Sequence, residues 1–130
     1  MDWKKLIEAA KKVRKNAYAP YSKFKVGAAV LAGSGKIYIG SNVENASFGL
    51  TICAERNAIA QAVAQGEKKI QAIAIVADSN ELTPPCGACR QVIYEFGKET
   101  EILLVNHKGK QQLFNISELL AAPFSFRKKK

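Results

Sequence analysis

The 130-residue sequence has little cysteine, histidine and methionine, and it contains no long hydrophobic run. Its three cysteines are an odd number, which argues against a disulfide framework. No apolar stretch approaches the roughly 20 residues that a membrane helix needs. The N-terminus lacks the apolar segment of a signal peptide, so we expect a cytoplasmic protein without membrane contact. The cysteines therefore need another explanation.

The net charge of +9 is concentrated at the two ends of the sequence. Residues 1–15 carry six basic and two acidic side chains, and residues 127–130 add four basic ones, which leaves +1 for everything between. Basic ends bind polyanions weakly through counterion release, but they are more often solvated ends that aid solubility. We therefore expect no specific nucleic-acid partner.

Length and composition predict one domain over residues 1–130, with a basic tail at 127–130. Hydrophobic periodicity and turn residues predict helices at 2–17, 52–65, 86–96 and 117–120, and strands at 25–32, 36–40, 70–77, 101–106 and 111–114. This order predicts an α/β fold, a three-layer α/β/α sandwich with a mixed sheet of about five strands. In such folds, ligands bind beyond the strand ends, at the N-termini of helices.

All three cysteines lie where two of the predicted helices begin. Cys86 and Cys89 have the C-x₂-C spacing, which lets two thiolates in one helical turn bind one tetrahedral ion. Cys53 precedes them by one helix and one strand, and that repeat can bring the two helix starts side by side. Free N–H groups and the helix dipole favour the thiolate form there. Three thiolates leave the fourth position of a zinc ion open for water, as in catalytic zinc sites.

Charged residues flank these cysteines. Glu55 lies two positions after Cys53, so we interpret it as a neighbour of the metal that moves protons, not as a ligand. Zinc with three thiolates carries a net negative charge. Arg56 and Arg90 follow cysteines by three and four positions, and we hypothesise that they donate to the sulfur atoms and offset that charge. Surface ion pairs are the alternative role for both arginines.

Residues 53–55 (Cys-Ala-Glu) and 85–90 (Pro-Cys-Gly-Ala-Cys-Arg) resemble the signature of the zinc deaminases. Residues 18–24 (Tyr-Ala-Pro-Tyr-Ser-Lys-Phe) and 42–46 (Asn-Val-Glu-Asn-Ala) narrow the resemblance to the branch that acts on nucleosides. The whole chain resembles the small homotetrameric cytidine deaminases of the cytidine/deoxycytidylate deaminase superfamily. This resemblance implies hydrolytic deamination of cytidine and deoxycytidine in pyrimidine salvage, with active sites shared between subunits.

The resemblance also implies roles for single residues. Cys53, Cys86 and Cys89 would hold Zn²⁺. Glu55 would take a proton from the zinc-bound water and deliver protons to N3 of cytosine and to the leaving amine. The expected nucleoside contacts are Asn42 and Glu44 with the ribose hydroxyls, Phe24 by packing, Ala54 with the edge of the base, and Phe124 from a neighbouring subunit, with Phe126 as the alternative.

Two other kinds of cysteine site remain open at this stage. Cys86 and Cys89 alone could form a thioredoxin-like redox pair. The single histidine, His107, could complete a structural zinc site as the fourth ligand, although its sequence context favours an exposed turn. Zinc held by three thiolates and solvent would separate an enzyme from a structural module.

The substrate contacts also have plainer alternatives. Asn42 and Glu44 could be turn residues, and Phe24 and Phe124 could serve in the core or in docking. Among functions, a deaminase of a modified nucleoside or a nucleoside antibiotic is the nearest alternative, followed by a structural zinc module that binds nucleic acid. A polynucleotide-editing deaminase needs a groove for flanking nucleotides and usually a longer chain.

Overall fold

The computed structural model describes residues 1–126, and the predicted basic tail at 127–130 lies outside them. The helices and strands occur in the predicted order, with a short 3₁₀ helix added between the second strand and the second helix. They are α1 (Trp3–Arg14), β1 (Val26–Ala32), β2 (Ile37–Ser41), η1 (Phe48–Leu50), α2 (Ala54–Ala64), β3 (Ile70–Ala77), α3 (Gly87–Phe96), β4 (Glu101–Val105), β5 (Gln111–Asn115) and α4 (Ile116–Leu119).

The strands form one five-stranded sheet in the order β2-β1-β3-β4-β5. Neighbouring strands are antiparallel except β3 and β4, which are parallel. A parallel pair needs a crossover connection, and α3 supplies it. The prediction of a mixed sheet of about five strands is therefore confirmed.

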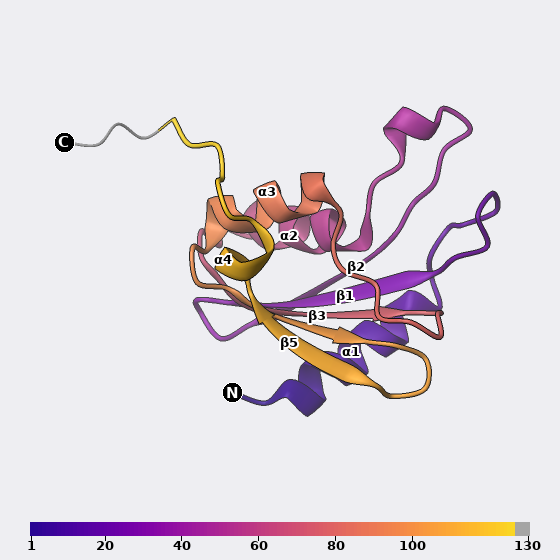
Figure 1. Cartoon of the computed structure of the whole chain (residues 1–130), viewed down its shortest axis with the longest axis horizontal. Helices are drawn as coiled ribbons and strands as arrows, with labels where there is room; N and C mark the ends of the chain where they lie inside the picture. The colour runs from indigo at the N-terminus through magenta and orange to yellow at the C-terminus, as the bar shows by residue number, and fades with distance from the viewer. Residues whose placement is uncertain (127–130) are drawn as a thin grey trace.

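Helices cover both faces of the sheet, which gives the predicted three layers (Figure 1). On one face, Leu6 of α1 packs over β1, β3 and β4. On the other face, Ile59 of α2 and Ile93 of α3 pack against the same sheet. The central strand β3 is buried on both faces, as its continuous apolar run predicts. Among residues 1–126, no helix is long and apolar enough to cross a membrane.

The first helix is shorter than the predicted range 2–17. Asp2 is its N-cap, and the Asp2 carboxylate accepts a hydrogen bond from the backbone N–H of Lys5 at 3.3 Å. At its other end the chain leaves the helix after Arg14, because the backbone N–H of Tyr18 donates to the carbonyl of Asn42 at 3.0 Å. Pairing with a distant loop thus ends the helix earlier than its periodicity predicts.

A close approach between β2 and the start of α2 depends on Gly40. A Cβ atom at this position would lie 2.4 Å from the backbone nitrogen of Ala58 and 2.7 Å from the carbonyl oxygen of Ala54. We expect Gly40→Ala to lower the free energy of unfolding by about 1–3 kcal/mol, because helix backbone must move away from the sheet. Thermal unfolding beside Gly49→Ala, whose Cβ would meet no atom within 4 Å, measures the effect. Equal melting temperatures for the two variants would contradict the argument.

Candidate active site

Helices α2 and α3 lie side by side on one face of the sheet (Figure 1), and their starts bring all three cysteines together. Cys53 and Cys86 are the N-cap residues of α2 and α3, so each lies one position before the first residue of its helix. The predicted helices at 52–65 and 86–96 included both cysteines. Cys89 lies in the first turn of α3 and is fully buried. Helix N-termini concentrate free N–H groups and positive dipole charge, which favours anionic sulfur at this place.

The sulfur atoms form a compact triangle. The Sγ atoms of Cys53 and Cys86 are 3.9 Å apart, those of Cys86 and Cys89 are 3.5 Å apart, and all three lie within 4.8 Å of one another. Zinc–sulfur bonds of about 2.3 Å in a tetrahedron place sulfur atoms roughly 3.8 Å apart. The three thiols are therefore spaced as ligands of one zinc ion, and they are the only such group of His, Cys, Asp or Glu within residues 1–126.

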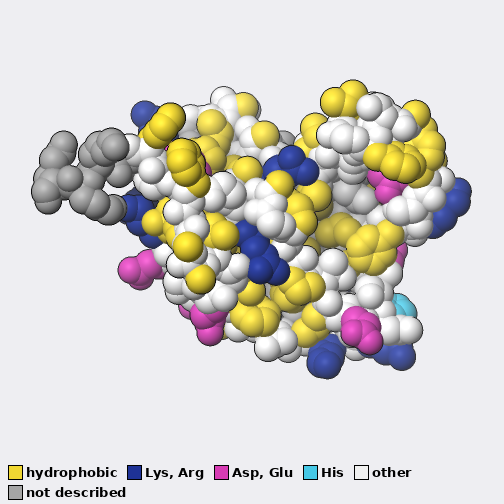
Figure 2. Space-filling view, turned by 45° about the horizontal axis from the view of Figure 1, so that its top comes forward, with side chains coloured by type: hydrophobic (Ala, Val, Ile, Leu, Met, Phe, Trp, Pro, Cys, Tyr) yellow, Lys and Arg dark blue, Asp and Glu magenta, His cyan; other side chains and the backbone are white. Residues whose placement is uncertain are grey.

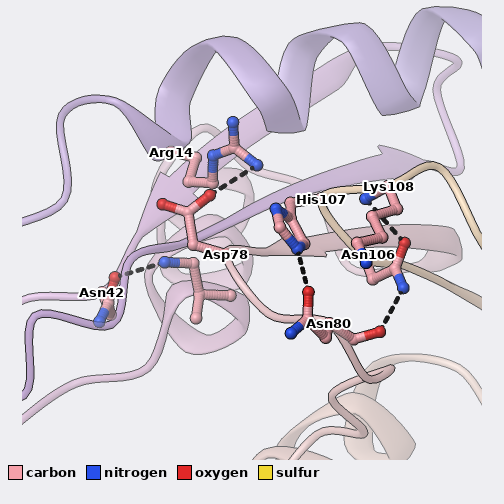
Figure 3. Close-up of polar contacts among 8 residues, drawn as sticks. Arg14, Asn42, Asp78, Asn80, Asn106, His107 and Lys108 are labelled. Carbon is pink, nitrogen blue, oxygen red and sulfur yellow. Dashed lines mark hydrogen bonds and ion pairs between the residues drawn. The ribbon is translucent and has the colours of Figure 1, made fainter.

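His107 lies away from this triangle, in the exposed turn between β4 and β5 that its sequence context predicts. Its Nε2 atom is 2.6 Å from Oδ1 of Asn80 (Figure 3). The neighbouring Asn106 amide donates to the carbonyl of Asn80 at 2.6 Å, so this corner of the structure braces the loop that leads to α3. His107 therefore does not join the cysteines as a fourth ligand in the described part of the chain.

The thiols differ in charge because they interact with one another and with Arg56. The pKa of Cys53 is lowered to about 5, chiefly by its hydrogen bond with the Cys89 thiol and further by Arg56, whose Nη2 donates to Cys53 Sγ at 3.5 Å. The pKa of the Cys89 thiol is raised, because the same interaction holds its proton and because the thiol is buried. Cys53 is thus the first of the pair to become a thiolate.

The Glu55 carboxyl group lies in the first turn of α2, beside Cys53. Its side chain is 5% exposed, and burial is the main cause that raises the pKa of Glu55 to about 7. A carboxyl group with a pKa near neutrality can both accept and return a proton, as general acid–base chemistry requires. Ala54, just before it, is fully buried at the start of the helix.

Asn42 and Glu44 are held by hydrogen bonds to the chain around residues 21–26. The Asn42 side chain is buried, donates to the carbonyl of Phe24 at 2.8 Å and accepts from the N–H of Val26 at 2.9 Å. The Glu44 carboxylate accepts from the backbone N–H of Tyr21 at 2.9 Å, and from both the backbone and the hydroxyl of Ser22. Both side chains thus brace this loop, and each keeps capacity for a further hydrogen bond.

The backbone connects this polar segment to the cysteines. Val43 and Ile52 exchange two backbone hydrogen bonds of 2.9 Å, which places residues 42–44 next to the chain that enters Cys53. In addition, the Asn57 side chain of α2 donates to the carbonyl of Ser41 at 2.8 Å. The loop after β2 is therefore attached to the start of α2 at two points.

The Arg90 guanidinium donates to backbone carbonyl groups rather than to sulfur. Its Nε donates to the carbonyl of Pro85 and its Nη1 to the carbonyl of Leu119, both at 2.8 Å. In place of the predicted contact with a thiolate, Arg90 thus joins the start of α3 to the end of α4. The reason is that α4 ends at Leu119 and leaves its carbonyl free to accept a hydrogen bond. Residue spacing within α3 gives no information about this acceptor.

The C-terminal segment lies along α3. The Gln91 amide donates to the carbonyl of Phe124 at 2.9 Å and accepts from its N–H at 3.2 Å. The side chains of Phe124 and Phe126 are 66% and 87% exposed, with ring centroids 5.4 Å apart. They line a pocket with Tyr94, one helical turn beyond Gln91 and away from the cysteines. Phe124 therefore faces solvent in the isolated chain and does not contact its own sulfur triangle.

Comparison with known proteins agrees with this geometry. Residues 1–105 match the family model described as the cytidine and deoxycytidylate deaminase zinc-binding region. The chain belongs to the cytidine and deoxycytidylate deaminase family. The deaminase signature in residues 53–55 and 85–90 thus predicted the family correctly, and the chain is an enzyme of the hydrolase class.

Individual family members are similar over nearly the whole chain. The cytidine deaminase of Halalkalibacterium halodurans is 48% identical over 126 residues, covering 96% of each chain. The probable cytidine deaminase of Dictyostelium discoideum is 43% identical over 128 residues, covering 90% of this chain and 86% of the relative. The crystal structure of cytidine deaminase from Burkholderia pseudomallei superposes with a TM-score of 0.91 at 48% identity, covering 95% of this chain and 100% of that one.

Zinc is the metal of this family, and the donor set fits it. Three cysteine sulfurs are soft ligands that select zinc over magnesium or calcium. The Arg56 guanidinium contacts this set, since its Nη2 donates to Cys53 Sγ at 3.5 Å, and its Nε is buried without a hydrogen-bond partner in the described structure. The guanidinium thus lies against sulfur rather than in solvent.

We expect Arg56→Ala to weaken zinc binding by about 10-fold or more, the usual effect of removing a group that supports a metal ligand. The physical reason is that three thiolates bring more negative charge than one zinc ion neutralises. Competition with a chromogenic chelator measures the affinity. Arg14→Ala is the matched control, since Arg14 pairs with Asp78 at 3.1 Å on the other face of the sheet (Figure 3). Equal zinc affinity in both variants would refute the charge argument.

Three residues whose side chains connect segments of the site were not predicted from the sequence, namely Ser22, Asn57 and Gln91. Each acts through a hydrogen bond to a residue at least 16 positions away. Ser22 lies inside the segment 18–24 that carries the family resemblance, so the signal that could have singled it out was present. Asn57 and Gln91 follow the two cysteine segments closely, but nothing in their spacing indicates a partner.

Proposed function

We propose that this protein catalyses the zinc-dependent hydrolytic deamination of cytidine and deoxycytidine to uridine and deoxyuridine, with release of ammonia. The observation that carries the proposal is a buried carboxyl group, Glu55, beside three thiols that converge at two helix N-termini. The thiols can hold the metal, and the carboxyl group can move the protons that the reaction requires. Two relatives that are 48% identical to this chain are cytidine deaminases, which supports this substrate class.

The mechanism assigns the metal to Cys53, Cys86 and Cys89. Zinc held there would supply a water molecule of lowered pKa for the attack on C4 of the base near neutral pH. Glu55 accepts the proton that this water loses and delivers it to N3 of cytosine. It then carries the second proton, which comes from the hydroxyl group added at C4, to the amine, and the C4–N bond breaks to release ammonia. Burial raises the pKa of Glu55 to about 7, which suits a group that first accepts a proton and then returns it.

The remaining predicted residues would bind the nucleoside. Asn42 and Glu44 would accept or donate hydrogen bonds at the ribose hydroxyls, with the capacity that their loop contacts leave free. Phe24 is half-buried against the core next to them, which suits packing against the nucleoside. The backbone of Ala54 would meet the edge of the base at the start of α2.

Assembly into a homotetramer with shared active sites belongs to the same proposal. Exposed hydrophobic side chains gather on the loop between β2 and α2, where Phe48 is 75% and Leu50 64% exposed (Figure 2). Burial of such a patch against other copies would remove it from water. Phe124, held outward by Gln91, would then complete a neighbouring site. We place this activity in cytoplasmic pyrimidine salvage.

A substrate panel tests the proposed function. We expect loss of absorbance with cytidine and deoxycytidine, little change with cytosine or adenosine, and no activity after chelation of the metal. Readdition of zinc should restore activity. Turnover of cytosine or adenosine without turnover of cytidine would refute the substrate assignment. Turnover of none of the four would favour a modified nucleoside or a nucleoside antibiotic as the substrate.

A further inference from the structure

The Ser22 hydroxyl connects two residues that the proposed function assigns to the nucleoside. It donates to Oε2 of Glu44, and it accepts from the backbone N–H of Phe24 at 3.0 Å. The backbone N–H of Ser22 adds a further bond to Oε1 of Glu44 at 3.1 Å. The orientation of the carboxylate and the path of the chain at Phe24 therefore depend on one small side chain.

The connection continues to Asn42. Its amide donates to the carbonyl of Phe24 at 2.8 Å, and its Oδ1 accepts from the N–H of Val26 at 2.9 Å. Glu44, Ser22, Phe24 and Asn42 thus form a continuous series of hydrogen bonds. Because each member restrains the next, a change at Ser22 reaches all the expected sugar contacts at once.

The backbone between Ser22 and Phe24 gives an independent indication of restraint. Lys23 has a φ angle of +61°, in the left-handed region that a residue with a side chain rarely occupies. Its N–H donates to the carbonyl of Ala19 at 3.0 Å. Such a conformation persists only where the surrounding contacts over-determine it. The bonds of Ser22 on one side and of Phe24 on the other are those contacts.

Within this series of hydrogen bonds, Glu44 is the residue whose charged side chain is expected to bind the sugar of the substrate. The Ser22 hydroxyl is the main cause that lowers the pKa of Glu44, so the carboxylate stays ionised. Two backbone N–H groups bind one carboxylate oxygen and the hydroxyl binds the other. An ionised carboxylate has about four acceptor positions. The three protein donors fix the orientation of the carboxylate, so its remaining acceptor position has a fixed direction. Recognition of a hydroxyl donor requires such an oriented acceptor.

We infer that Ser22 is a positioning residue for nucleoside recognition, which aims the Glu44 carboxylate at a sugar hydroxyl. This inference rests on the proposed function. Ser22 is exposed and takes no part in the hydrophobic core, so its role is in the orientation of neighbouring groups rather than in stability. Without its hydroxyl, Oε2 of Glu44 loses its protein donor, and the carboxylate is free to turn toward water.

Binding of paired product analogues to zinc-loaded Ser22→Ala tests the inference. Uridine carries the 2′ and 3′ sugar hydroxyls and 2′,3′-dideoxyuridine lacks them, so the pair isolates the hydroxyl contacts expected of Glu44 and Asn42. By calorimetry we expect Ser22→Ala to bind uridine about 10-fold more weakly, the scale of one hydrogen bond to a charged group. Its affinity for dideoxyuridine should change by less than about 2-fold, as should kcat for cytidine, and Ser22→Thr should restore uridine binding.

Ser34→Ala is the matched control. The Ser34 hydroxyl lies in the hairpin between β1 and β2, and it also donates to a glutamate, Glu67 in the loop after α2, at 2.6 Å. This variant should bind both ligands as the wild-type protein does. An equal loss of both affinities in Ser22→Ala, a fall in zinc content or melting temperature, or no change at all would overturn the inference alone. Wild-type protein that neither binds uridine nor deaminates cytidine would overturn the proposed function and the inference with it.

Discussion

Glu55→Gln is expected to keep its zinc and to lower kcat for cytidine by about three orders of magnitude, the scale of general acid–base catalysis. The amide has nearly the shape of the carboxyl group but cannot accept and return a proton. Because Glu55 is 5% exposed and does not belong to the cysteine cluster that would hold zinc, its replacement should leave the metal in place. Steady-state kinetics and elemental analysis of the same preparation measure the two quantities.

Glu8→Gln provides the control for a carboxyl group removed elsewhere. Glu8 is exposed on α1, on the face of the sheet opposite to the cysteines, so its replacement should leave kcat unchanged. The role assigned to Glu55 would be refuted by a variant that keeps wild-type turnover. Loss of zinc together with activity would instead show that Glu55 is needed to hold the metal.

Removal of a cysteine has the second large expected effect. We expect both Cys86→Ala and Cys89→Ala to lose zinc and all measurable deamination, because two thiolates do not form a stable tetrahedral zinc site. Metal binding energy is also folding energy, so both variants should melt at lower temperature, by on the order of 10 °C when zinc is in large excess over its dissociation constant. Elemental analysis and thermal scans, with and without a chelator, measure these effects.

The two cysteines differ in burial, and this difference separates the contribution of the metal from that of packing. Cys86 is exposed and Cys89 fully buried. Chelated wild-type protein should therefore melt close to Cys86→Ala, while Cys89→Ala should melt lower, because it also leaves a cavity in the core. Zinc retained at full stoichiometry in either variant would contradict the assignment of the ligands.

Local patterns predicted most of the fold. The apolar run at 70–77 predicted a strand covered on both faces, and β3 is the buried centre of the sheet. The spacing of Cys86 and Cys89 predicted two ligands in one turn of a helix, and their sulfurs are 3.5 Å apart. These inferences succeed because they depend on the geometry of a helix or a strand, which residue spacing determines.

Contacts between distant segments were not predictable in the same way. Arg90 was expected at sulfur, but its guanidinium binds carbonyl groups at Pro85 and Leu119. The Ser22 hydroxyl binds Glu44, 22 positions away. Spacing within one helix shows which side chains share a face, but a hydrogen-bond donor takes whichever acceptor the packing of other segments brings to it. Such partners depend on the packed tertiary structure.

Residue identities and their local order were enough to indicate a deaminase with three sulfur ligands and a carboxyl group for proton transfer. Folding added the convergence of Cys53 with the other two cysteines, the burial that raises the pKa of Glu55, and the bonds that orient Glu44. The physical reason is distance. The sequence determines which chemical group stands at each position. The contacts of that group with distant segments form only when the hydrophobic layers pack together.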